Sequence, residues 1–410
     1  MKKLLFIPIL STSILYAQTI TITEAIQKTL NTHPDLKGFA LEISKNDQNI
    51  ISARSAYLPH ISFEAEYDPQ RTYVLPKNGE LSSLNQQNIQ VGVSLQQKIF
   101  DFDKTLYLME SANIDKEIAK LSLQEAKNLL IYKVKSLYET ILIQKEALKV
   151  RREDLRTKEE LYRQSLAFVT QGLKTTTDST RFLSALYGAK ESVSKAQAEL
   201  EKSAATLSLY MHEDIVQDTE FETTLPIKQT ENITLNNNTE LQIYEKNIDK
   251  FRLQTQARKA EHYGSLDLVA AYTHFENINA YNTNFIGLTL NIPLFSGFDT
   301  SAKEQIATIS TSMARESKAS KTLLLKEELS KLLIDQKQYV ITIEAKKAQI
   351  EASNSTKNLL EARYKEGLAT YIELLDITAI ALTSELELLE AKYNLALIAY
   401  KINYLTGENL

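Results

Sequence analysis

Two stretches without glycine or proline constrain what this chain can fold into. The first runs from Asp103 to Val169, about 67 residues, and the second runs from Asp299 to Glu366. Glycine and proline are the residues that most readily interrupt a helix, so both stretches are predicted to be continuous helices. At about 1.5 Å per residue, each helix is on the order of 100 Å long. A single globular domain cannot enclose such a rod.

The surface of these rods is predicted to be mostly solvated. Apolar residues recur every seven positions along the first stretch, which is the narrow seam of coiled-coil packing. Lys, Glu, Gln and Ser occupy the other faces, and helices of this kind can form the wall of a hollow cylinder as well as a solid bundle. The seam residues are Val134, Ile141, Leu148, Leu155, Tyr162 and Val169.

The chain repeats itself once. The segment ending in FVTQGL resembles the segment ending in RYKEGL, and Gly367 follows Gly172 by 195 residues. A second pair of segments, VGVSLQQKIFDF and IGLTLNIPLFSGF, has the same displacement between Gly92 and Gly287. The order predicted for each copy is a helix, two strands, a long helix, a turn and a returning helix. The first repeat is predicted to span residues 18–212 and the second 237–410, with a linker at 213–236.

Four strands are predicted from alternation of apolar and polar residues. They lie at about 60–74 and 87–99 in the first repeat, and at about 264–276 and 283–295 in the second. Their length suits a tilted crossing of a bilayer, with apolar side chains toward lipid and polar side chains toward water. A soluble sheet packed on a helix has the same alternation, but few other segments are present to build a globular domain.

Four strands cannot close a barrel, and open edges are not tolerated in lipid. Three copies bring twelve strands together, which is within the range of outer membrane barrels, whereas two bring about eight and leave little lumen. The predicted fold is therefore mainly α with a membrane β-barrel. It consists of a trimeric, 12-stranded barrel and long coiled-coil helices, which form either a hollow cylinder or a solid bundle.

The first 17 residues have the pattern of a secretory signal peptide. Lys2 and Lys3 precede an apolar run that begins at Leu4, and the small residue Ala17 is followed by Gln18. The apolar run is shorter than the roughly 20 residues that a spanning helix needs. Export and cleavage after Ala17 are predicted, and an uncleaved anchor is the alternative.

Composition and motifs indicate no catalytic, cofactor or metal site. The chain has no Cys, which excludes disulfides, zinc-thiolate sites and cysteine nucleophiles. Its net charge of −5 gives no general reason to bind nucleic acid. The sequence contains no phosphate-binding loop, no nucleophile elbow and no metalloprotease spacing. The histidines lie in different predicted elements: His33, His60, His212, His262 and His274.

The order and duplication of these segments resemble the TolC family of outer membrane efflux proteins. The segments that carry the resemblance are TITEAIQKTLNTHPDL, LNIPLFSGFDT, YKEGLATYIELLD and the terminal YLTGE. The resemblance covers the whole mature chain. It implies a homotrimeric channel in the outer membrane, with a long coiled-coil α-helical barrel in the periplasm and a small equatorial belt at the linker.

The same resemblance implies where the channel narrows. Glu373 and Asp376 match an acidic pair at the closed periplasmic entrance, and Tyr364 matches a tyrosine that holds the helices together there. Asp178 takes the position of Glu373 in the first repeat. Three copies would place six carboxylates around one constriction, which favours cations and raises some of their pKa values by mutual repulsion. The alternative is that these carboxylates only complement the start of a helix.

The two turns are predicted to dock a partner. We expect them to receive the hairpin of a periplasmic adaptor protein that links the channel to an inner-membrane transporter. The residues at the tips are Gly172, Leu173, Gly367 and Leu368. Drugs, metal ions and secreted polypeptides leave through ducts of this family, in efflux pumps or type I secretion systems, and the inner-membrane partner usually sets the specificity. The competing interpretations are a periplasmic adaptor and a structural coiled-coil protein without a pore.

Overall fold

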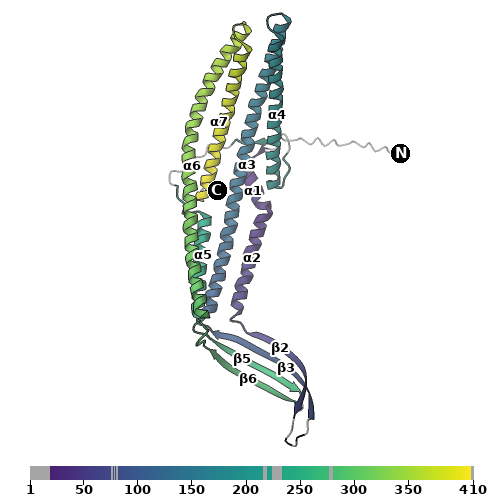
Figure 1. Ribbon diagram of the computed structural model, residues 1–410, viewed down its shortest axis with the longest axis vertical. Helices are drawn as coiled ribbons and strands as arrows, with labels where there is room; N and C mark the ends of the chain where they lie inside the picture. Colours follow the sequence, from purple (N-terminus) through teal and green to yellow (C-terminus); the bar gives the residue numbers. More distant parts are fainter. Residues whose placement is uncertain are drawn as a thin grey trace, which may run out of the picture. The chain divides into compact units, whose positions relative to one another are not determined.

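The computed structural model describes residues 19–74, 77, 79, 82–215, 219–223, 233–276 and 280–407. The predicted signal peptide lies outside the described residues. The chain divides into two compact units, each built from segments of both predicted repeats (Figure 1). Unit 1 contains residues 1–36, 126–238 and 325–410, and unit 2 contains residues 37–125 and 239–324.

Unit 2 contains a four-stranded antiparallel sheet. Its strands are β2 (His60–Val74), β3 (Ser82–Phe100), β5 (Ser265–Glu276) and β6 (Tyr281–Asn291). They are paired in the order β2-β3-β5-β6, so that β2 and β6 lie at the edges (Figure 1). β3 begins five residues earlier than predicted, where it continues the pairing with the end of β2. β6 ends four residues earlier, because Pro293 has no backbone N–H to continue a ladder.

The strand register gathers apolar side chains on one face of this sheet. Residues directly opposite each other in neighbouring strands share a face. Ile61 lies opposite Leu95, Leu95 opposite Ala270, and Ala270 opposite Ile286. The next row on that face joins Phe63, Val93 and Tyr272. Leu95 and Ala270 are half-buried and the other side chains are exposed, with 69% of Ile61 and 76% of Ile286 accessible, so this face has no partner within the described chain.

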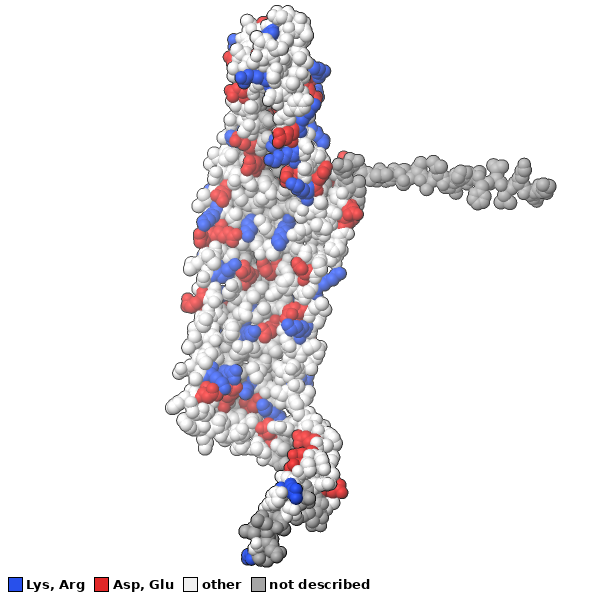
Figure 2. Space-filling model, turned by 45° about the vertical axis from the view of Figure 1, so that its right-hand side comes forward, with Lys and Arg blue, Asp and Glu red and all other residues white. Residues whose placement is uncertain are grey.

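Four helical segments of unit 2 repeat the order of the strands. They are α2 (Pro34–Ser55), the first part of α3 (Lys104–Thr170), α5 (Thr239–Ala260) and the first part of α6 (Asp299–Lys365). Ion pairs join neighbours, such as Asp47 with Lys116 at 2.6 Å, Asp115 with Lys250 at 2.7 Å, and Glu240 with Lys321 at 2.7 Å. Acidic and basic side chains are intermingled along the helices (Figure 2). No helix in the described part of the chain is long and apolar enough to cross a membrane.

A buried carboxylate fixes the corner between β3 and α3. Asp101 is 1% exposed and accepts hydrogen bonds from the Tyr57 hydroxyl at 2.8 Å and the Thr105 backbone N–H at 3.1 Å. The chain turns from β3 into α3 through Phe102 and Asp103, which both have positive φ. Burial, followed by the hydrogen bond to Asp101, raises the pKa of Tyr57 to about 12, so this phenol stays protonated and can donate.

Unit 1 holds two helical hairpins. One joins the second part of α3 to α4 (Thr176–Met211), and the other joins the second part of α6 to α7 (Tyr371–Thr406). α3 and α6 each have 67 residues, and α4 and α7 each have 36. The short helix α1 (Ile22–Thr32) and the two-residue strands β1 (Thr19–Ile20) and β4 (Glu220–Phe221) complete the unit.

Tyr138 anchors the small parallel sheet of unit 1. Its side chain is fully buried, and its hydroxyl lies 2.7 Å from the carbonyl oxygen of Ile20 and 2.9 Å from that of Glu222. β4 lies within the predicted linker at 213–236, of which the structure describes residues 213–215, 219–223 and 233–236. Ile20, Ala25, Leu207 and Met211 surround the tyrosine in one core cluster.

The predicted seam of α3 holds for only part of its length. Val134, Ile141 and Leu148 are buried, whereas Leu155, Tyr162 and Val169 are half-buried. Toward the tip the buried positions are instead Lys158, Leu161 and Ser165. A strict seven-residue repeat drifts by about 20° per heptad on a straight helix, so it leaves the packed face after a few heptads.

Replacing Gly264 by Ala is expected to destabilise unit 2. Gly264 precedes β5 with φ +88°, and an added Cβ would lie 1.9 Å from the carbonyl oxygen of Asn291. Left-handed backbone alone disfavours Ala by about 1 kcal/mol, and the contact with a backbone atom adds to this. The midpoint of thermal unfolding in detergent, followed by circular dichroism, should fall.

Gly188 supplies the matched control. It lies inside α4, is exposed, and has no described atom within 4 Å of an added Cβ. Gly188→Ala should raise the same midpoint, because Ala favours a helix interior by about 1 kcal/mol over Gly. Equal shifts from the two substitutions would contradict the role given to Gly264.

Candidate functional site

The two predicted turns of unit 1 have the same backbone geometry. Gly172 and Gly367 adopt φ of +72° and +77°, the left-handed conformation that glycine adopts without strain. The Leu173 N–H donates to the Phe168 carbonyl at 2.9 Å, and the Leu368 N–H donates to the Arg363 carbonyl at 2.7 Å. Each glycine N–H also donates to the carbonyl three residues earlier, and the two bonds together form the Schellman ending of a helix.

The apex of each turn presents one leucine to solvent. Leu173 is 64% exposed and Leu368 is 68% exposed. Ala369 is buried, so the second turn has a small apolar residue packed inward directly after its exposed leucine. The apices therefore combine fixed backbone with accessible apolar side chains.

Each turn leads into its returning helix through a threonine and an acidic residue. Oδ2 of Asp178 accepts from the Thr175 backbone N–H at 3.2 Å. Oε2 of Glu373 accepts from both the backbone N–H and the hydroxyl of Thr370 at 2.8 Å, and the Thr370 hydroxyl oxygen accepts from the Glu373 N–H at 3.3 Å. This reciprocal arrangement is a capping box. Within one chain, the acidic residues therefore begin helices α4 and α7.

The acidic residues differ in their surroundings. Asp178 is 8% exposed, whereas Glu373 and Asp376 are exposed to solvent one helical turn apart on α7. The backbone N–H of Thr370, and then its hydroxyl, lower the pKa of Glu373. Glu373 is thus held as an anion in a single chain, and the mutual repulsion expected among several chains stays a prediction.

Tyr364 lies at the centre of a buried aromatic cluster between the two hairpins. It is 1% exposed, and its ring lies 6.0 Å from that of Phe168 and 5.7 Å from that of Phe182. Lys174 Nζ stands 5.3 Å from the ring centroid. The buried Tyr364 hydroxyl has no hydrogen-bond partner among the described residues. Burial, and secondarily the charge of Asp178, raise its pKa to about 12.

A buried ion pair lies on α3, a few residues before the part of that helix that joins the Tyr364 cluster. The sequence pattern did not predict it. Lys158 and Asp154 lie one turn apart on α3, with Nζ and Oδ1 3.7 Å apart and about a tenth of each side chain exposed. Burial lowers the pKa of Lys158 and raises that of Asp154, while the attraction between them opposes both shifts. The only signal in the sequence was the position of Lys158, between Leu155 and Tyr162 of the apolar repeat.

The predicted site residues therefore fall into two groups. Tyr364 and Asp178 belong to the interior of unit 1, and Glu373, Asp376 and the apical leucines are on its surface. Among the described residues, no three His, Asp or Glu side chains are grouped as a metal site requires. The turns of the two hairpins therefore present exposed carboxylates and exposed leucine side chains to solvent.

The sequence matches the model of the family described as "Outer membrane efflux protein" over residues 25–211 and 232–408. Among curated proteins, it is similar to the outer membrane protein TolC of Escherichia coli (strain K12). The two are 24% identical, over 99% of this chain and 85% of TolC.

Solved structures share the fold at low sequence identity. The outer membrane protein VceC from Vibrio cholerae superposes with a TM-score of 0.81 at 13% identity, over 94% of this chain and 96% of VceC. The Campylobacter jejuni CmeC outer membrane channel superposes with a TM-score of 0.80 at 14% identity, over 94% of this chain and 85% of CmeC. By sequence and by fold, the chain belongs to the outer membrane efflux protein family and is an outer membrane channel.

Proposed function

We propose that three copies of the chain form the exit duct of a tripartite pump or a type I secretion system. The observation that carries this proposal is the four-stranded sheet, which has one apolar face and two unpaired edges, β2 and β6. Unpaired backbone groups are strongly disfavoured in hydrocarbon, so β2 of one copy would pair with β6 of the next. Three copies supply twelve strands, a number that leaves a water-filled lumen.

The helices of unit 2 support the same assembly. α2 and α6 lie at the two ends of the row of helices, and both carry large exposed apolar side chains. On α2, Leu41 is 70% and Ile51 is 59% exposed, and on α6, Ile309 is 58% and Met313 is 65% exposed. α2 of one copy against α6 of the next would bury these residues and would continue the helical wall around a central tunnel.

Trimer formation is tested with the purified chain in mild detergent. Mass measured by light scattering, corrected for detergent, should correspond to three chains, and the same fractions should open pores in planar bilayers. Material that remained monomeric without any pore would refute the assembly. Material that was monomeric in detergent but formed pores would show that the chains assemble only in the bilayer.

The proposed duct narrows at the ends of the α6–α7 hairpins. Glu373 and Asp376 are exposed on the first turns of α7, and a threefold axis near them would bring six carboxylates around one opening. Such a ring would favour cations over anions. Tyr364, packed against Phe168 and Phe182, would tie the two hairpins of each copy together, with Asp178 nearby in the interior.

Neutralising the two exposed carboxylates is expected to weaken cation preference. Glu373→Gln with Asp376→Asn should reduce the cation-to-anion permeability ratio about twofold or more, because the field at the constriction loses its fixed charges. Gln serves in a capping box as Glu does, so the start of α7 is preserved. Reversal potentials in a salt gradient across a planar bilayer measure the ratio.

Glu390→Gln is the matched control for this prediction. Glu390 is an exposed carboxylate on the same helix, 14 residues beyond Asp376. Its neutralisation should leave the permeability ratio unchanged. The constriction would have to be placed elsewhere if the double variant behaved like wild type.

We further propose that the two apices dock a periplasmic adaptor, which joins the duct to the inner-membrane transporter that supplies the energy. The exposed Leu173 and Leu368 on fixed backbone support this docking, since accessible apolar side chains on a rigid turn favour insertion between the helices of a partner. The role in this proposal is that of a passive conduit and not of an enzyme.

Site-specific cross-linking tests the docking. Because the natural chain has no Cys, Leu173→Cys and Leu368→Cys each create one unique attachment point. Both should cross-link to the co-expressed adaptor of an active pump. Leu209→Cys, at a side chain 75% exposed near the other end of α4, is the control that should not cross-link. Persistent failure at both apices while the pump stays active would exclude docking there.

A further inference from the structure

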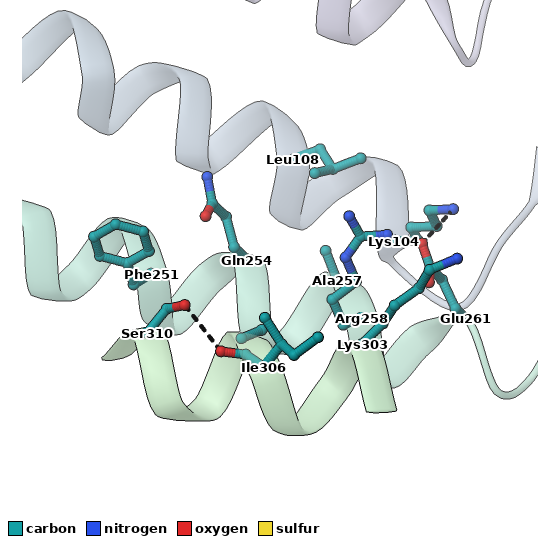
Figure 3. Close-up of a pocket in the computed structure, with 11 residues that line it drawn as sticks. Lys104, Leu108, Phe251, Gln254, Ala257, Arg258, Glu261, Lys303, Ile306 and Ser310 are labelled. Atoms are coloured by element: carbon teal, nitrogen blue, oxygen red, sulfur yellow. Dashed lines mark hydrogen bonds and ion pairs between the residues drawn. The ribbon is translucent and has the colours of Figure 1, made fainter. Parts of the chain in front are cut away.

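A groove of about 530 Å³ lies where the helices of unit 2 approach the sheet. It is enclosed by the first turns of α3, the last turns of α5 and the first turns of α6 (Figure 3). Its apolar lining includes Leu108, Ala257 and Ile306, one from each helix. Each of the three helices therefore contributes an apolar side chain to the groove.

Basic side chains from all three helices border this groove. Lys104, Arg258 and Lys303 line it, and Glu261 is the single acidic residue of the lining. Glu261 is shared, since it lies 2.9 Å from Lys104 Nζ and 2.8 Å from Arg258 Nη1. Lys303 pairs with Asp299 beside the groove at 2.6 Å, and about half of the Arg258 and Lys303 side chains is exposed. With Asp299 counted, the three basic and two acidic side chains therefore leave one positive charge in excess.

Aromatic rings connect the same place to the apolar face of the sheet. Phe100 lies opposite Leu266 in the strand register, and Leu266 shares its face with Leu268 and Ala270. The Phe100 ring lies 4.9 Å from Phe102, whose ring lies 5.3 Å from Tyr263. Phe102 precedes Lys104 by two residues, and Tyr263 follows Glu261 by two. Exposed aromatic rings beside basic residues are typical of the boundary between a bilayer and water.

We propose that this groove binds an anionic phospholipid of the periplasmic leaflet of the outer membrane. The proposal rests on the membrane insertion proposed above. The phosphate would be held by Arg258 and Lys303, and part of an acyl chain would lie along Leu108, Ala257 and Ile306. Lys104 and Glu261 keep the helices together around the groove. The excess of basic groups is the feature that selects an anionic over a zwitterionic headgroup.

The test is lipid retention by the intact trimer in detergent, measured by native mass spectrometry after titration with phosphatidylglycerol or phosphatidylcholine. Wild type should retain phosphatidylglycerol preferentially. Arg258→Gln with Lys303→Gln should weaken that retention about 25-fold, because each basic group near an anionic headgroup contributes about fivefold. Lys259→Gln removes an exposed charge from the same end of α5 without lining the groove, and it should leave retention unchanged.

A second variant tests the apolar part of the groove. Ala307→Phe adds a ring to the α6 side of the lining without a change in charge, and it should also reduce retention. Glycerol 3-phosphate, which has the headgroup chemistry without acyl chains, should not compete. If glycerol 3-phosphate displaced the lipid at the same concentration as the lipid itself, the proposal would be overturned, because the groove would then bind anions without acyl chains.

Pore conductance of each variant, measured in the same preparation, separates this proposal from the channel itself. Normal conductance with lost retention supports a lipid site. Unaltered lipid retention in both groove variants would overturn the lipid site. If these variants kept their lipid but changed the pore conductance, the groove would belong to the water-filled duct. Absence of any pore in wild type would refute the channel assembly instead.

Discussion

The requirement that every backbone N–H and C=O find a partner in hydrocarbon governs the rest of this structure. Within one chain, β3 and β5 satisfy that requirement on both sides, while β2 and β6 each have one side left open. The apolar face formed by rows such as Ile61, Leu95, Ala270 and Ile286 suits lipid. A surface of this kind is stable only when the edges are joined, so membrane insertion and assembly depend on each other.

Aromatic packing inside unit 1 favours one alignment of its helices over others. An uninterrupted apolar seam would allow neighbouring helices to slide by a heptad with little change in energy. The ion pair of Lys158 and Asp154 lies within α3 alone, so it does not distinguish one alignment from another. The contacts of the Tyr364 ring with Phe168 and Phe182 do, because they join α6 to α3 and α4 and would be lost if the helices slid.

Features that depend on local sequence were predictable, whereas features that depend on contacts between distant segments were not. The absence of Gly and Pro anticipated α3 and α6, and Gly172 and Gly367 marked the turns. The strand ends were less accurate, since pairing with a neighbour extended β3. The burial of Lys158 and the packing of Phe182 on Tyr364 require residues far apart in the chain to meet, which no local pattern specifies. The groove between α3, α5 and α6 arises in the same way.

The self-contained geometry of the two hairpin ends has an evolutionary consequence. The hydrogen bonds that close each turn join backbone atoms to one another, so any residue that tolerates exposure suits the position of Leu173 or Leu368. Mutations at these positions leave the folding of the shaft unaffected. Lineages are therefore free to diversify what the ends recognise while retaining an unchanged conduit behind them.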